Sequence, residues 1–152
     1  MNNTNVTLSR DKSKLDPSVI HAFLTESYWS KGCSMDNVLC RIENALCFGV
    51  YDKNQQVGFA RVITDCATFA YLADVFILEN YRGQGLSKQL MTFILAQPDL
   101  QNLKRWTLAT RDAHGLYAQF GFTPLSKTEL WMETMNLDAY SVWERDFTEG
   151  EV

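Results

Sequence analysis

The stretch Arg82-Gly83-Gln84-Gly85-Leu86-Ser87 decides the fold, because it places two glycines between an apolar run and a helical pattern. Leu90 and Ile94 continue the pattern of Leu86 up to Pro98, which predicts a helix that begins at this turn. A helix N-terminus carries amide N–H groups without helical partners and a partial positive charge, so phosphate binds there when glycines let the backbone approach. The same spacing also occurs in plain strand-to-helix connections, so the neighbouring segments must decide between the two interpretations.

The run before the turn, residues 70–78, is apolar at every position except Asp74. Such a run predicts a strand buried inside a sheet. A carboxylate in that setting is costly unless it is hydrogen-bonded, paired with a cation, or open to a cleft. Asp74 is therefore either a structural partner of Arg61, or a base or amine-binding group in a functional site.

Tyr117 lies downstream of the turn on a short helix predicted for residues 113–119, with Leu116 and Phe120 on the core side. An aromatic residue at such a position is often a packing residue. Its phenol, with an ordinary pKa of ~10, could also return a proton to a leaving thiolate, whose thiol has a pKa of ~8.5.

The remaining pattern predicts a mixed α/β sheet with helices packed on it. The expected strands cover residues 5–10, 46–51, 56–64, 69–78, 105–109 and 130–135. Two further helices are expected before the main sheet, because Asp16-Pro17 and Ser34 are typical helix starts.

The 152 residues predict a single domain, 1–152, with one substantial core. Fourteen basic and eighteen acidic side chains give a net charge of -4 without a basic run, so neither nucleic acid nor a membrane is an expected partner. No leader or spanning segment stands out, and a cytoplasmic protein is expected. Four cysteines without a Cys-x-x-Cys pair and two histidines predict free thiols and no metal site.

Two segments in order, Phe76-Ile77-Leu78-Glu79-Asn80-Tyr81-Arg82-Gly83-Gln84-Gly85-Leu86 and Leu116-Tyr117-Ala118-Gln119-Phe120-Gly121-Phe122, resemble the GNAT superfamily of acetyl-CoA-dependent N-acetyltransferases. The resemblance covers about residues 46–124. It implies a mixed α/β GNAT-like fold with a mostly antiparallel twisted sheet of about six to seven strands and about four flanking helices.

The resemblance also implies roles for individual residues. The loop that wraps the CoA pyrophosphate corresponds to Arg82, Gly83, Gln84, Gly85, Leu86, Ser87 and Lys88, and the strand whose backbone binds pantetheine corresponds to Phe76, Ile77 and Leu78. Tyr117 corresponds to the general acid toward the CoA thiolate, and Asp74 lies on the strand where many members carry a base. Two positions depart from the family pattern, because Ser87 replaces a glycine or alanine and Thr110 replaces a frequent asparagine.

The expected activity is direct acetyl transfer to a primary amine, with a small molecule favoured over a protein. Tyr28, Trp29, Trp131 and Glu133 are the candidate acceptor-binding residues, and their aromatic and acidic character favours a small cationic amine. The alternative is that Trp131 is a core residue and Glu133 a solvated one. The alternative function is a non-catalytic acyl-CoA-binding or protein-interaction module, and an unpaired edge strand near the C-terminus makes a homodimer possible.

Overall fold

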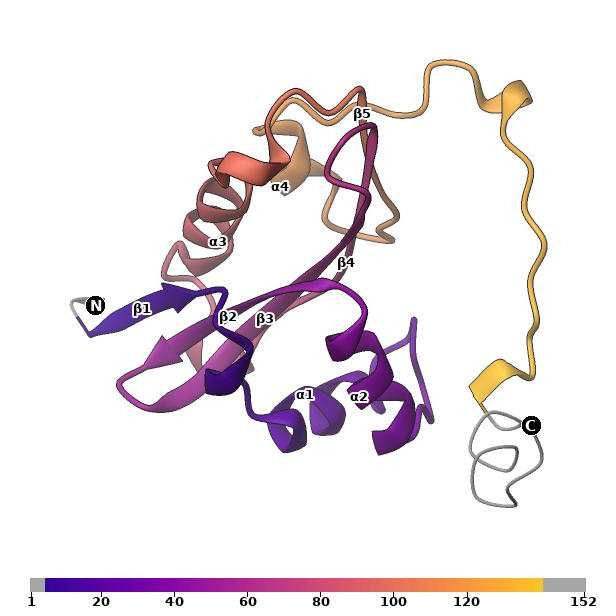
Figure 1. Cartoon of the computed structure of the whole chain (residues 1–152). Coiled ribbons are helices and arrows are strands. Elements are labelled where there is room, and N and C mark those ends of the chain that lie inside the picture. Colours follow the sequence, from indigo (N-terminus) through magenta and orange to yellow (C-terminus); the bar gives the residue numbers. More distant parts are fainter. Residues whose placement is uncertain (1–4, 141–152) are drawn as a thin grey trace.

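The computed structural model describes residues 5–140, which build a five-stranded sheet with helices on both faces (Figure 1). In sheet order the strands are β1 (Val6–Ser9), β2 (Leu46–Asp52), β3 (Gln55–Thr64), β4 (Phe69–Ile77) and β5 (Arg105–Leu108). Neighbours are antiparallel from β1 to β4, whereas β4 and β5 are parallel. The predicted mixed α/β, mostly antiparallel sheet is thus confirmed, with five strands where six to seven were expected.

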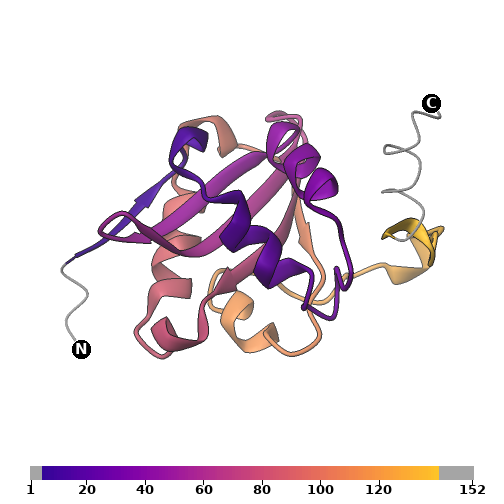
Figure 2. The same ribbon diagram turned by 90° about the horizontal axis from the view of Figure 1, so that it is seen from below.

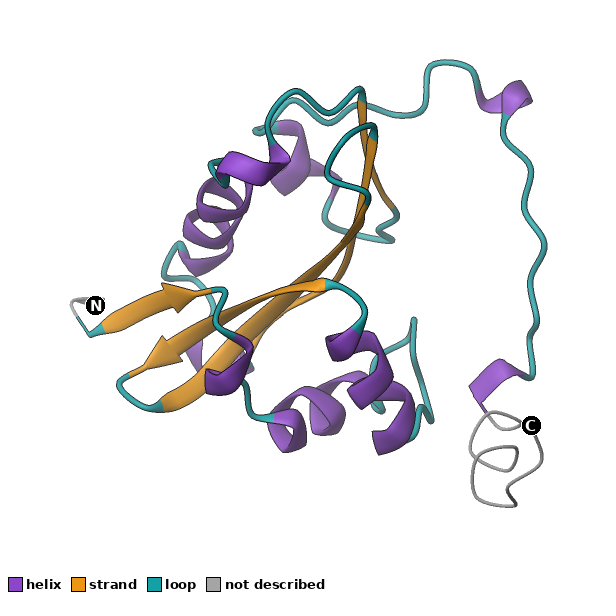
Figure 3. Cartoon of the chain, in the orientation of Figure 1, coloured by secondary structure: helices purple, strands orange, loops and turns teal. Residues whose placement is uncertain are grey.

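The helices form two groups on opposite faces of the sheet (Figures 2 and 3). They are α1 (Pro17–Leu24) and α2 (Met35–Glu43) on one face, and α3 (Leu86–Leu95) and α4 (His114–Ala118) on the other; short 3-10 turns cover Lys12–Lys14, Glu79–Tyr81, Pro98–Leu100 and Thr128–Leu130. The predicted helix starts are confirmed, because the Asp16 carboxylate accepts from the Ser18 N–H and the Ser34 hydroxyl from the Asn37 N–H.

A hydrophobic cluster fills each side of the sheet and fixes these helices. Leu90 and Ile94 of α3 pack with Val62 on one side, while Ile20 of α1 and Val38 of α2 belong to the cluster on the other side. All five side chains are fully buried. β4 contributes Leu72 to the first cluster and Phe76 to the second, so the strand that carries Asp74 is packed on both faces.

The parallel pair β4–β5 separates part of the way along β4. Pairing extends from Phe69 opposite Arg105 only to Leu72 opposite Leu108, so the β5-side edge of β4 is unpaired from Ala73 onward. A β-bulge lies at the same place, since two residues, Asp74 and Val75, stand opposite one residue of β3. Asp74 has φ 54°, a left-handed conformation that aspartate tolerates better than most residues.

The closing strand expected over residues 130–135 does not form, and that prediction is wrong. After the Thr128–Leu130 turn the chain leaves the sheet and runs outward (Figure 1). Met132 is 96% exposed and Met135 71% exposed. The alternating pattern suits a strand, but residues 131–135 pair with no strand within residues 5–140.

Candidate active site

A cavity of about 520 Å³ opens where β4 and β5 separate. The loop after α1 and the helix α4 close its sides. Its lining includes Tyr28, Trp29, Arg41, Asp74, Arg111 and Tyr117. Four of the residues predicted for the site, Tyr28, Trp29, Asp74 and Tyr117, are thus brought together from segments far apart in the sequence.

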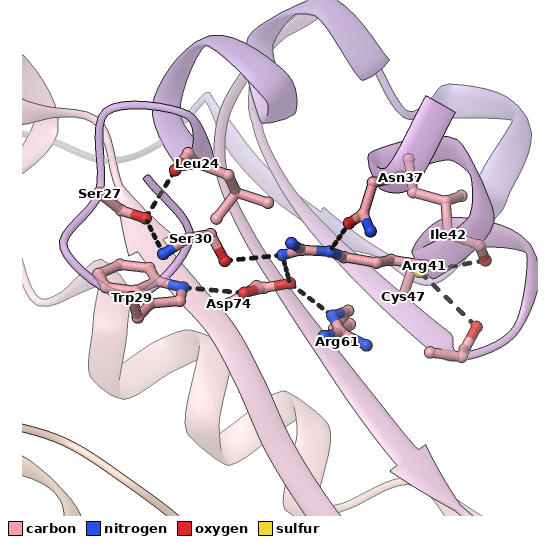
Figure 4. Close-up of polar contacts among 11 residues, drawn as sticks. Leu24, Ser27, Trp29, Ser30, Asn37, Arg41, Ile42, Cys47, Arg61 and Asp74 are labelled. Atoms are coloured by element: carbon pink, nitrogen blue, oxygen red, sulfur yellow. Dashed lines mark hydrogen bonds and ion pairs between the residues drawn. The ribbon is translucent and has the colours of Figure 1, made fainter. Parts of the chain in front are cut away.

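Asp74 is the centre of a polar network at the floor of the cavity (Figure 4). Its carboxylate accepts from Trp29 Nε1 at 2.8 Å, from Arg41 Nη1 at 3.1 Å and from Arg61 Nε. Burial pushes its pKa upward, but the charges and hydrogen bonds of Arg61 and Arg41 outweigh burial and leave the pKa below its ordinary value. Asp74 is therefore an ionised, doubly ion-paired carboxylate.

Arg61 is the partner that the sequence offered as the structural alternative, whereas Arg41 was not anticipated. The guanidinium of Arg41 also donates from Nη1 to the Ser30 hydroxyl at 2.9 Å and from Nε to the Asn37 side chain at 2.6 Å. Arg41 precedes Ile42 at the edge of the apolar face of α2. The position of Arg41 beside the buried face of α2 was the feature of the sequence from which a buried ion pair could have been predicted.

Tyr117 comes from α4 and is 8% exposed. Within residues 5–140 its hydroxyl makes no hydrogen bond, and the residue lines the cavity. Burial, with a smaller contribution from Tyr28, raises the pKa of the phenol above its ordinary value. The phenol is therefore protonated at neutral pH, and its proton is not committed to another described residue.

Tyr28 connects the loop after α1 with the segment that leads into α4. Its hydroxyl accepts from the Arg111 backbone N–H at 3.1 Å, and the Arg111 guanidinium carbon lies 3.9 Å from the centre of its ring. The Thr110 hydroxyl accepts from the Ala113 N–H at 3.1 Å just before α4 begins. These contacts fix the wall of the cavity next to Tyr117.

Two of the predicted acceptor residues lie elsewhere. Trp131 lines a different cavity and stacks on Arg105, with 4.8 Å from the guanidinium carbon to the ring centre. Glu133 lies on the exposed outward segment. Tyr140, which the sequence did not single out, lines the cavity of Asp74 instead, with the Arg41 guanidinium carbon 5.3 Å from its ring centre.

The glycine turn leads into α3 as expected, at the end of β4. Gly83 and Gly85 have φ 77° and 79°, and no side chain caps the helix. The amides of Leu86 to Lys88 in the first turn therefore lack helical acceptors. The side chain of Arg82 folds back, and its Nε donates to the Ile77 carbonyl at 2.9 Å.

The expected pantetheine strand, Phe76 to Leu78, is partly engaged within the protein. Besides the Ile77 carbonyl, the Leu78 N–H is already used, donating to the Val57 carbonyl at 2.8 Å. The unpaired edge of β4 begins at Ala73. The unpaired edge therefore overlaps the expected pantetheine strand at Phe76 and Ile77.

The cysteines are reduced and none lines the cavity of Asp74. Cys33 and Cys47 are buried while Cys40 and Cys66 are exposed, and burial raises the pKa of Cys47 to about 11. Within residues 5–140, no cluster of three or more metal-ligating side chains occurs. None of the helices in that range has the length and apolar character needed to cross a bilayer.

Comparisons with known proteins agree with this geometry. Residues 43–124 match the family model described as the acetyltransferase (GNAT) domain. A crystal structure of a candidate GNAT-family acetyltransferase from Xanthomonas campestris pv. campestris is 49% identical, with a TM-score of 0.87 over 90% of this chain and 96% of that chain. A candidate acetyltransferase of Gibberella zeae is 28% identical over an alignment of 133 residues, which covers 74% of this chain and 75% of that protein.

The fold is also shared with a more distant solved structure. A GNAT-family acetyltransferase from Elizabethkingia anophelis with acetyl-CoA bound has a TM-score of 0.60 at 14% identity, over 88% of this chain and 89% of that chain. The family model alone covers more than half of the 152 residues. The chain therefore belongs to the GNAT family of acetyltransferases.

Proposed function

We propose that this acetyltransferase moves the acetyl group of acetyl-CoA directly to the nitrogen of a primary amine. The observation that carries the proposal is a single cavity that combines the unpaired edge of β4 with the uncommitted phenol of Tyr117. The β4 edge suits an amide-containing chain, because it offers backbone donors and acceptors in a row. Tyr117 lines the same cavity, so its phenol is our candidate acid toward a thioester held by that edge.

Acetyl-CoA would be held at two places. The amides at the start of α3 and the glycines of the turn fit the pyrophosphate, because φ near 80° at Gly83 and Gly85 lets the backbone approach without a side chain. The unpaired β4 edge fits the amides of the pantetheine arm. The structure of the same fold from Elizabethkingia anophelis has acetyl-CoA bound, which supports acetyl-CoA as the ligand.

The chemistry requires one nucleophile and one acid. The neutral amine nitrogen attacks the thioester carbonyl, a C–N bond forms and the C–S bond breaks. The Tyr117 phenol donates its proton to the departing sulfur, and the extra amine proton passes to water. No step needs a cysteine nucleophile, and no cysteine is among the residues that line the cavity.

Asp74 has a positioning role in this proposal. A carboxylate with a lowered pKa and three donors from Trp29, Arg41 and Arg61 is a weak base. It holds these three side chains against the cavity instead of taking the amine proton itself. The contacts therefore favour organisation of the acceptor site over general base catalysis.

The charges around the cavity inform the nature of the acceptor. Three guanidinium groups line it, from Arg41, Arg61 and Arg111, against the carboxylates of Asp74 and Asp112. Glu133, which had favoured a cationic acceptor, does not contribute. The cavity volume suits a small molecule. We therefore infer a small primary amine that also carries an anionic group such as a carboxylate.

The test is thiol release from acetyl-CoA with matched pairs of amines. Each pair joins an amino acid to the amine that remains after its decarboxylation, so that the two differ in the carboxylate. The amino acid is expected to have a kcat/KM at least about tenfold higher, because one charge-assisted hydrogen bond is worth ~1.5–3 kcal/mol. Equal kcat/KM values for the two members of each pair would contradict an anionic group on the acceptor. If acetyl-CoA binds but no amine releases thiol, the non-catalytic alternative is favoured.

Substitution of Gly85 by valine is expected to weaken acetyl-CoA binding about tenfold or more. A β-branched residue is strained at φ 79°, and the turn must shift its amides to relieve that strain. Gly32 is the matched control, because it has the same φ and equally open surroundings outside the turn. Calorimetry should show weaker acetyl-CoA binding for Gly85→Val and not for Gly32→Val; equal affinities would place the pyrophosphate elsewhere.

A further inference from the structure

The outward segment, residues 131–137, is here called the arm. Three of its side chains are aliphatic and almost fully in solvent, with Met132 96%, Met135 71% and Leu137 87% exposed. Residues 132–135 make no backbone hydrogen bond with another part of the chain that the structure describes. Such a segment is stabilised by a partner in two ways. Its backbone N–H and C=O groups form hydrogen bonds, and its apolar side chains are removed from water.

The sequence of the arm has the two-residue period of a strand with one apolar face. In extended conformation, Trp131, Met135 and Leu137 lie on one face, and Glu133 is its single polar member. Met132, Thr134 and Asn136 lie on the opposite face, which is polar apart from Met132. The arm therefore has the pattern of a sheet strand, although the sheet of its own chain does not include it.

The sheet of residues 5–140 has an edge strand, β5, to which a further strand could pair. Within residues 5–140, β5 pairs only with β4, so its outer edge carries no strand. A cavity of about 610 Å³ lies along this edge, and its lining includes Trp106 of β5, Leu95 of α3 and Phe122. These are apolar side chains that are only half-buried in the chain as described. An added strand with one apolar face would cover them.

The arm does not fold onto its own β5. Trp131 stacks on Arg105, the first residue of β5, and has extended backbone with φ -99° and ψ 135°. The chain therefore continues outward at this point without reversing (Figure 1). At the far end, Tyr140 packs over Arg41 of α2. The arm is thus held between two anchors, away from the edge that it matches.

We propose that two copies of this chain exchange arms, the arm of each adding as a strand to the outer edge of β5 in the other. Each copy offers one arm and one bare edge, so two identical contacts close a twofold dimer and leave neither element unpaired. The chemistry of the partner is thereby defined: it is a second copy. The inference is independent of the proposed acetyl transfer.

The first experiment measures mass by size-exclusion chromatography with light scattering. The chain is expected to have twice its 17.4 kDa mass at micromolar concentration. The double variant Met135→Asp with Leu137→Asp should weaken the dimer at least about 1000-fold, since four apolar side chains per dimer lose their burial. The control is the double variant Leu39→Asp with Ile63→Asp, because both residues are apolar, partly exposed and outside the arm. This variant should leave the dimer intact.

Strand addition is tested with a matched pair at Thr134. Thr134→Pro removes a backbone N–H from the ladder and should weaken the dimer, whereas Thr134→Ala should not. Both substitutions are at an exposed position, so the fold of the single chain should persist. A monomeric wild type would overturn the proposal, and so would a dimer that tolerates both the proline and the paired charges.

A second experiment distinguishes the partner copy from the chain's own arm. In a background with Cys40 and Cys66 replaced by serine, Thr107→Cys on β5 is combined in turn with Glu133→Cys, Thr134→Cys or Met135→Cys on the arm. Mild oxidation should produce a disulfide-linked dimer on non-reducing gels for at least one combination. A disulfide formed only within single chains would show that the arm returns to its own sheet and would contradict the exchange.

Discussion

Replacement of Tyr117 by phenylalanine is expected to lower kcat for acetyl transfer by about 100- to 10,000-fold, the range that one positioned acid contributes. Tyr117 lines the cavity, its hydroxyl makes no competing hydrogen bond in the described chain, and burial keeps it protonated. Thiol-release kinetics at saturating acetyl-CoA measure the effect. Acetyl-CoA affinity, measured by calorimetry, should stay nearly unchanged because only one oxygen atom is removed.

Tyr71 provides the matched control, since it is a half-buried tyrosine that lines the same cavity from β4. Tyr71→Phe should keep kcat within a few-fold of the wild type. The pH profile gives a second readout: a phenol acting as acid is lost as pH rises through its raised pKa, so the wild-type rate should fall only at a pH above the ordinary range of a tyrosine. Tyr117→Phe should lack that fall, and an unchanged kcat would exclude Tyr117 from the mechanism.

Replacement of Asp74 by asparagine is expected to lower the free energy of unfolding by about 3–5 kcal/mol, the cost of breaking a buried ion pair from one side. The carboxylate side chain is 3% exposed, and its partners Arg41 and Arg61 are 11% and 15% exposed. Both guanidinium groups would remain largely buried without their counter-charge. Such a loss is a large part of the ~5–15 kcal/mol of a typical domain. Urea denaturation followed by circular dichroism measures it.

Asp99 is the comparison for this effect, because it also pairs with an arginine, Arg10, but at the surface. Asp99→Asn should cost less than about 1 kcal/mol. Since the folded-state pKa of Asp74 is lowered, its contribution is present above the unfolded pKa near 4 and is lost as pH falls through the folded value. Equal costs for the two substitutions would mean that the Asp74 network is not a stabilising element.

Local signals in the sequence were sufficient for the elements on which the site is built. Asp16-Pro17 and Ser34 determine helix starts through contacts within three residues, so their pattern is readable without tertiary structure. The glycine turn is readable for the same reason. Tyr117 was placed on a helix whose apolar neighbours define its orientation, and the structure brings it to the cavity with Asp74.

Features that depend on contacts between distant segments were not readable. Arg41 of helix α2 reaches Asp74 of strand β4 across 33 positions, so no local spacing relates them. The bulge at Asp74 depends on the register between β3 and β4. Residues 130–135 have the alternating pattern of a strand, but the pattern does not tell which sheet edge they pair with, or whether that edge belongs to the same copy of the chain. Trp131 and Glu133 were misplaced for this reason.

The separation of β4 from β5 also makes the free energy of unfolding depend on ligand binding. Backbone groups from Ala73 onward have no ladder partner on the β5 side, so a substrate that pairs with them completes the sheet. A ligand at 100 times its Kd adds about 2.7 kcal/mol to the unfolding free energy. With the binding mode proposed above, a chain saturated with acetyl-CoA should therefore unfold less often than the free chain.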